Sequence, residues 1–151
     1  MDDRALSSPM THVLTIAIVT VLVSGLLVAA GSTLADQREH AAEEQLETIG
    51  HRLSLELATA ERLAARGTGG TATLRADHVD RVTGRFYTVR LTDDPDACGG
   101  VEPCLVLQSS DPDARVAVPV RVDAAVTEST VPGGRVVVVH DGGAVRLEAS
   151  A

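Results

Sequence analysis

The chain begins with a long stretch of helix-compatible residues whose pattern changes part-way from uniformly apolar to amphipathic. Val13–Ala30 reads VLTIAIVTVLVSGLLVAA and carries no charge. A transmembrane helix needs about 20 mainly apolar residues, so this stretch is long enough to cross a bilayer. From Asp36 to Arg66, apolar residues recur every three or four positions, as one face of a helix requires. No proline or glycine pair interrupts Met10–Arg66, and the pattern predicts a single helix there.

The amphipathic half of this helix, residues 36–66, has an apolar stripe with two possible uses. The stripe could support a β-sheet of the same chain, or it could pack on neighbouring subunits. Its predicted members are Leu46, Ile49, Leu53, Leu57, Ala60 and Leu63. Gly67 is expected to supply a left-handed cap. An unbroken helix would be about 85 Å long, and Gly50, which costs up to about 1 kcal/mol against alanine, is the place where it would bend.

The remaining residues, 67–151, are predicted to form a small β-rich domain, which we call the head. Pro119 indicates an edge strand or a bulge, and Asp141-Gly142-Gly143 is a strong hairpin signal. The predicted fold class is therefore α+β, a long N-terminal helix followed by an antiparallel sheet or small sandwich. The expected strands are Thr71–Arg75, Arg85–Thr92, Cys104–Ser109, Val116–Val122, Arg135–His140 and Ala144–Glu148.

Small residues recur within the membrane half of the helix, residues 10–35. Gly25 and Ala29 are spaced four apart, as are Gly31 and Ala35. Such small-xxx-small pairs let transmembrane helices approach closely. They mark a candidate helix-packing face, although small residues are also ordinary in membrane helices.

The head has little bulky material for a core and two cysteines to support it. Phe86 and Tyr87 are the only aromatic residues of the chain, so valine has to supply most of the packing. Cys98 and Cys104 either form a disulfide or remain as two buried thiols. A loop this short would stabilise the fold by about 2 kcal/mol. The spacing is not C-x-x-C, which argues against a redox dithiol or a zinc knuckle.

The chain is acidic, and it contains no lysine. All 13 basic residues are arginine, against 21 Asp and Glu, which gives a net charge of −8. A lysine-free acidic surface resembles proteins of haloarchaea, where molar salt shortens the Debye length to about 3 Å and screens the self-repulsion. Biased codon usage would also favour arginine over lysine. No basic stripe occurs, so nucleic acid is not an expected partner.

The first residues, 1–9, form a short polar leader before the apolar run. Arg4-Ala5-Leu6, followed by Ser7-Ser8-Pro9-Met10, resembles the class III signal of archaeal type IV pilins and pilin-like proteins. The resemblance implies cleavage by a prepilin peptidase between Ala5 and Leu6, a cytoplasmic N-terminus and an extracellular head. Bacterial members have glycine where this chain has Ala5, and a glutamate where it has Met10. Archaeal members often lack that glutamate.

Two other readings of the N-terminus stay open. Thr33 and Ala35 would suit a secretory cleavage site before Asp36, although the apolar region of a cleaved signal is typically about 7–15 residues. The segment could also be an uncleaved single-pass anchor.

No catalytic constellation is found along the chain, and neither an enzyme nor a cofactor is expected. There is no G-x-S-x-G elbow, and the glycine pairs lie in turns instead of forming a phosphate loop. His40 and His51 are too far apart on the helix to share a metal. The remaining candidates read better as solvated loop groups: His78 with Asp77 and Asp80, His140 with Asp141, and Asp93, Asp94 and Asp96 as weak calcium ligands.

Two functions follow from this organisation. The first is a pilin-like or pseudopilin subunit that assembles with other such subunits through its N-terminal helix. The alternative is a single-pass, membrane-anchored binding module that faces the cell exterior and does not polymerise. Major pilins, minor pilins and secretion pseudopilins share the features above, so the subclass stays open.

Overall fold

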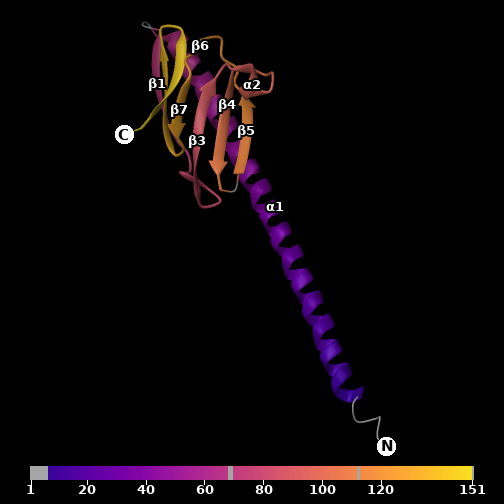
Figure 1. Cartoon of the computed structure of the whole chain (residues 1–151). Helices are drawn as coiled ribbons and strands as arrows, with labels where there is room; N and C mark the ends of the chain where they lie inside the picture. The colour runs from indigo at the N-terminus through magenta and orange to yellow at the C-terminus, as the bar shows by residue number, and fades with distance from the viewer. Residues whose placement is uncertain (1–6, 68–69, 112, 151) are drawn as a thin grey trace, which may run out of the picture. The chain divides into compact units, whose positions relative to one another are not determined.

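The computed structural model describes residues 7–67, 70–111 and 113–150, with side chains from residue 12 onward except at position 32. The chain forms two compact units, Met1–Gln37 and Arg38–Ala151. We call them the N-terminal and C-terminal units. A single helix contributes to both, and the β-strands belong to the C-terminal unit (Figure 1).

The helix α1 runs from Ser7 to Arg66, which confirms the predicted long N-terminal helix and its end. The amide of Gly67 donates to the carbonyls of Leu63 and Ala64, at 3.1 and 3.2 Å. Gly67 itself does not adopt the left-handed backbone conformation, so the predicted glycine cap is wrong. The helix closes by hydrogen bonds to its last free carbonyls instead.

The head is built from short strands in two sheets. In the first sheet the strand order is β1-β8-β9-β6, and in the second it is β2-β3-β4-β5, with β7 also pairing with β3. All pairs are antiparallel except β6 with β9. The elements are β1 (Thr71–Asp77), β2 (Arg81–Val82), β3 (Arg85–Thr92), α2 (Pro95–Cys98), β4 (Cys104–Ser110), β5 (Asp113–Pro119), β6 (Ala125–Val126), β7 (Ser129–Pro132), β8 (Arg135–Asp141) and β9 (Ala144–Ala149).

The predicted hairpin and edge strand are confirmed. Asp141 pairs with Ala144 across a two-residue turn, in which Gly142 and Gly143 have φ of 61° and 109°. Positive φ at both central positions is what a tight hairpin turn requires. Pro119 ends β5, which lies at the edge of its sheet, where the missing N–H of proline costs no ladder bond.

The predicted strand Val116–Val122 is wrong in its limits, because β5 starts at Asp113 and ends at Pro119. Apolar alternation extended the prediction to Val120 and Val122, which contact the core after the strand has ended. The same pattern missed Ala114, which is buried near the start of β5. The short elements β2, β6, β7 and α2 were not predicted, since two to four residues carry little periodicity.

The apolar stripe of α1 packs into the core of the head. Its buried members lie in one cluster with the inward side chains of both sheets. In Figure 1, β3, β4 and β5 lie side by side along this part of α1. Of the two uses predicted for the stripe, the structure therefore shows support of the sheets. Those members are Ala42, Leu46, Ile49, Leu53, Leu57 and Ala60.

Leu63 does not belong to the stripe. Its side chain is 47% exposed, whereas Ala64 is 2% exposed. The stripe steps by four residues after Ala60 instead of by three, and both steps are compatible with one helix face. Sequence spacing alone could not choose between them.

Gly50 lies where the helix closely approaches the second sheet. A β-carbon at this position would lie 2.6 Å from Val118 Cγ2 and 2.9 Å from Leu107 Cδ1. Since α1 is helical on both sides of Gly50, the residue is a close-approach position in a continuous helix. The absence of a side chain lets β4 and β5 pack directly on the helix backbone.

We predict that Gly50→Ala lowers the stability of the C-terminal unit by about 1–2 kcal/mol. Overpacking costs about 1–3 kcal/mol, and the better helix propensity of alanine returns at most about 1 kcal/mol. Thermal unfolding of the full chain in detergent micelles measures the change. Gly31→Ala is the matched control, because a β-carbon there meets open space. An unchanged or raised Tm for Gly50→Ala would contradict the packing argument.

Candidate functional site

The N-terminal unit presents an apolar surface that nothing in the described chain covers. Large apolar side chains from Val13 to Leu34 are 49–76% exposed, and α1 is long and apolar enough there to cross a membrane. The hydroxyls of Thr20, Ser24 and Thr33 donate to carbonyls four residues earlier, at 2.7–3.1 Å. These hydroxyls are thus hydrogen-bonded within the helix, so placing them in an apolar environment leaves no donor unpaired.

The four small residues predicted to form a packing face lie within this exposed surface. A β-carbon added at Gly25 or Gly31 would meet no atom within 4 Å, and Ala29 and Ala35 are exposed too. The open space at these positions would let a second helix approach closely. Helix packing through these four residues stays a prediction. The predicted processing residues, Arg4, Ala5 and Leu6, lie outside the described residues.

Polar contacts hold the C-terminal half of α1 against the head. Glu56 Oε2 lies 3.1 Å from Nε2 of His78, whose side chain is 4% exposed. Glu61 Oε1 accepts the backbone amides of Asp123 and Ala124, at 2.8 and 2.7 Å. Buried polar groups are costly unless they are paired, so these contacts fix the two glutamates toward the head.

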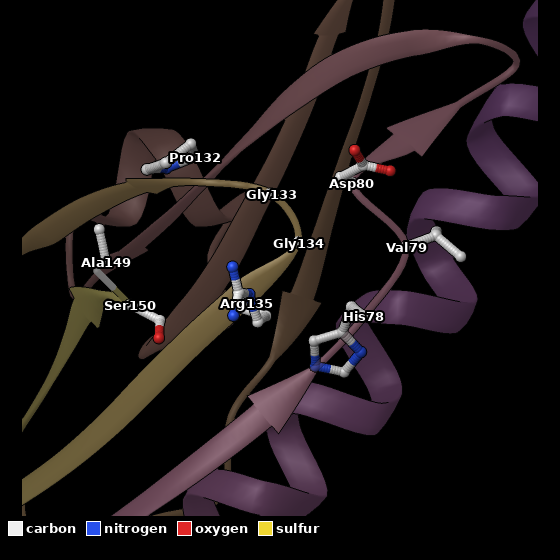
Figure 2. Close-up of a pocket in the computed structure, with 9 residues that line it drawn as sticks. All are labelled: His78, Val79, Asp80, Pro132, Gly133, Gly134, Arg135, Ala149 and Ser150. Atoms are coloured by element: carbon white, nitrogen blue, oxygen red, sulfur yellow. The ribbon is translucent and has the colours of Figure 1, made fainter.

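A cavity of about 430 Å³ opens at one end of the first sheet. Figure 2 shows its lining residues: His78, Val79 and Asp80 follow β1, Pro132–Arg135 run from the end of β7 to the start of β8, and Ala149 ends β9 with Ser150 after it. The lining includes one cationic side chain and one anionic side chain, Arg135 and Asp80. Within this lining, His78 is paired with Glu56 of α1, and its ring is hydrogen-bonded to no hydroxyl or thiol of the described residues.

Tyr87 anchors the turn beside this cavity. Its hydroxyl donates to the carbonyl of Val79 at 2.8 Å and lies 3.4 Å from the amide of Gly134. The side chain is 3% exposed, and burial raises the pKa of the Tyr87 phenol above its ordinary value, with the hydrogen bond from Gly134 opposing the shift. Tyr87 therefore holds the β1–β2 loop and the β7–β8 turn together in its neutral form.

The two cysteines are joined in the structure. Cys98 and Cys104 form a disulfide with a Cα–Cα distance of 5.6 Å. Both side chains are buried with Val106 in a small cluster separate from the main core. The bond ties the last residue of α2 to the first residue of β4.

Several of the candidate calcium and metal residues make other contacts. Asp94 caps α2, since its side chain accepts the amide of Asp96 at 3.1 Å. His78 pairs with Glu56 instead of with Asp77 or Asp80, and His140 Nδ1 lies 3.0 Å from the carbonyl of Gly70. On the helix, His40 lies 3.4 Å from Glu43 and His51 lies 3.5 Å from Glu47. Among the described residues, no group of three potential ligands is placed to hold a metal ion.

One family model matches residues 1–150, and it describes a family of unknown function, DUF7266. The chain belongs to the DUF7266 family. No curated protein and no solved structure matches the chain. The matched residues include both the N-terminal and the C-terminal unit.

We predict that stability of this DUF7266 protein falls as the pH rises above about 10. An unfolded tyrosine has a pKa of about 10, and folded Tyr87 keeps its proton to higher pH. Above that pH the unfolded state binds fewer protons, so alkali favours unfolding, whereas below it the contribution is fully present. Urea unfolding at rising pH measures the effect, and near-ultraviolet phenolate absorbance follows Tyr87 alone, since it is the single tyrosine of a chain without tryptophan.

Tyr87→Phe should abolish this alkaline loss and lower stability near neutral pH by about 1 kcal/mol, through the lost hydrogen bond. Adding the exposed tyrosine Phe86→Tyr to that variant gives the matched control, because Phe86 is 65% exposed. The control tyrosine should titrate without any change in stability. An alkaline loss that persists in Tyr87→Phe would assign it to another group.

We also predict that the Cys98→Ser/Cys104→Ser variant unfolds more easily by about 2 kcal/mol, the value expected for so short a loop. Guanidinium unfolding measures the change. A reducing agent should lower the stability of the parent protein by a similar amount and leave the variant unaffected. Equal stability of parent and variant would mean that the bond contributes nothing to the head.

Proposed function

We propose that this protein is a pilin-like subunit of a type IV pilus-like filament or secretion-type assembly at the cell surface. The observation that carries the proposal is α1, which continues from an exposed apolar segment into the core of a β-rich head. A simple anchor needs a membrane helix and a domain, but it does not need the same helix to be the core of that domain.

The apolar segment supports the proposal through its exposure. Its side chains are uncovered in the described chain, and they require either lipid or other helices around them. Gly25 and Gly31 leave room for a close neighbour. In the proposed mechanism, the segment leaves the bilayer during assembly, and burial among the helices of other subunits replaces its contact with lipid.

The head's position outside the cell is supported by its disulfide. Bonds of this kind persist in oxidising surroundings and are rare in the cytosol, and Cys98 is bonded to Cys104. The proposed orientation therefore has a cytoplasmic N-terminus, a single membrane crossing and an extracellular head.

The proposed partner in maturation is a prepilin peptidase that cuts between Ala5 and Leu6. The described helix begins at Ser7, so a cut at this point would leave all of it in the mature chain. Arg4 is the basic residue next to Ala5, and the peptidase would recognise it on the cytoplasmic side.

We predict that the protein isolated from its native cells begins at Leu6. N-terminal sequencing or intact mass measures this. Cells that lack the prepilin peptidase are the control, and the chain isolated from them should begin at Met1 or Asp2. A chain that starts at Asp36 would indicate a secretory signal, and an uncut chain in cells with active peptidase would indicate a plain anchor. Either result would overturn the proposal.

A further inference from the structure

A hollow of about 380 Å³ lies on the second sheet, on the face opposite to α1. Val89 and Leu107 point into the core that they share with α1, and side chains alternate between the two faces of a strand. Thr88 and Gln108, their neighbours in sequence, therefore point outward, and both are exposed. The volume lies within the range of about 300–1,000 Å³ that is usual for small-molecule sites. The lining of the hollow consists of Phe86, Tyr87, Thr88, Gln108, Ser110 and Pro132.

The strand register arranges the outward side chains in two rows. In the first row, Thr88 lies directly opposite Gln108 of β4 on one side and Pro132 of β7 on the other. Neighbouring strands are about 4.8 Å apart, so this row is about 10 Å wide. Phe86 and Ser110 lie two residues from Thr88 and Gln108, on the same face, and form the second row. Main-chain pairing of β3 with its two neighbours thus fixes the floor of the hollow.

Phe86 provides the main apolar surface of the hollow. The side chain is 65% exposed, although it is the single phenylalanine of a chain that is poor in aromatic residues. The guanidinium of Arg81 lies 4.5 Å from the ring centroid and holds the ring from one face by a cation–π contact. The other face of the ring remains open, and Pro132 adds a second rigid apolar ring from the neighbouring strand.

Three neutral polar side chains of the hollow have unused hydrogen-bonding groups. Within the described part of the chain, the hydroxyls of Thr88 and Ser110 and the amide of Gln108 have no hydrogen-bond partner. Each hydroxyl can both donate and accept, and the amide supplies two donors and an acceptor. A ligand that carries hydroxyl groups could pair with all three, whereas a purely apolar ligand would leave them unpaired.

The absence of charge in the lining limits the chemistry of the ligand. Charged residues make up 23% of the chain, yet none lines the hollow. Two arginines of β3 are paired with carboxylates: Arg85 Nη2 lies 2.9 Å from Asp111 Oδ2, and Arg90 Nε donates to Glu128 Oε1 at 2.8 Å. A charged ligand would therefore find no complementary group on the floor of the hollow.

We propose that this hollow binds an uncharged sugar unit of an extracellular glycan. The negative face of an aromatic ring attracts the C–H groups of a sugar ring, and Phe86 would stack on the sugar in this way. Thr88, Gln108 and Ser110 would form hydrogen bonds with its hydroxyl groups. This inference goes beyond the proposed function, because a filament subunit and a single anchored head would present the same surface.

A peptide fits this position less well. Extended peptides bind sheets by adding a strand at an edge, where main-chain groups are free. The hollow lies over β3 and β4, and the main chains of both strands are paired on their two sides, with β7 and β5 as the further neighbours. Only side chains are therefore available to a ligand, and they combine one open ring with neutral polar groups.

Nuclear magnetic resonance of the full chain in phosphocholine micelles tests the binding, since this detergent carries no sugar. Phe86 is the single phenylalanine, so ¹³C-labelled phenylalanine reports on this ring alone. The probes are neutral trisaccharides of glucose, mannose and galactose. We expect at least one of them to shift the ring signals saturably, with a dissociation constant on the order of 1 mM. No saturable shift with any of the three up to about 50 mM, well above that constant, would overturn the inference.

Substitutions test whether the hollow is the binding surface. Phe86→Ala removes the stacking ring and Gln108→Ala removes hydrogen bonds, and each should weaken binding about tenfold, as measured by saturation transfer observed on the sugar. Phe86→Tyr keeps an aromatic ring and should bind like the parent. Val101→Ala and Gln37→Ala are the matched controls, because both side chains are exposed outside the hollow, and they should leave binding unchanged.

Three further results would overturn the inference. Equal binding by the parent, Phe86→Ala and Gln108→Ala would place the sugar elsewhere on the protein. Tighter binding of a uronic acid trimer than of the neutral probes would show recognition of a charge, by Arg81 or by Arg115. Tighter binding of a neutral alanine peptide would indicate a peptide site. None of these results depends on the cut after Ala5, so the proposed function is tested separately.

Discussion

Burial of one face of α1 against the two sheets is the contact on which the head depends. The head has a single phenylalanine and a single tyrosine, and Phe86 is exposed. Leu46, Leu53 and Leu57 of α1 are fully buried and supply much of the bulk that the strands lack. Gly50 brings the helix close enough for Val118 to reach its backbone. A small valine-rich sheet is thus completed by a helix, because chains of this size bury too little surface on their own.

This contact also limits what the helix can do elsewhere. The apolar stripe from Ala42 to Ala64 is buried against the head, so it cannot contact a neighbouring subunit. Two surfaces of α1 remain uncovered in the described chain. One is the apolar segment from Val13 to Leu34. The other is the charged side of α1 opposite its buried stripe, where Leu55 is 66% exposed. Any assembly through α1 has to use one or both of them.

The features that could be predicted from the sequence are those set by local chemistry. The long helix, its end at Arg66 and the hairpin at Gly142 follow from periodicity and turn residues, and the disulfide was one of two options for Cys98 and Cys104. The features that could not be predicted depend on contacts between distant residues. The choice of Ala64 over Leu63, the limits of β5, and the contacts of His78 with Glu56 and of Tyr87 with Val79 all require the folded sheet. The same holds for Gly50, which the sequence marks as a weak point of the helix and the structure shows as a packing position.

The charge on the side of α1 opposite its buried stripe shows why a count of residues does not describe a surface. Between Arg52 and Arg66 the helix carries three arginines and two glutamates, which by composition is close to neutral. The fold removes both glutamates from that surface, since Glu56 meets His78 and Glu61 caps two backbone amides. In a protein with a net charge of −8, folding thus creates a positive end on the helix and leaves Glu44 and Glu47 exposed below it.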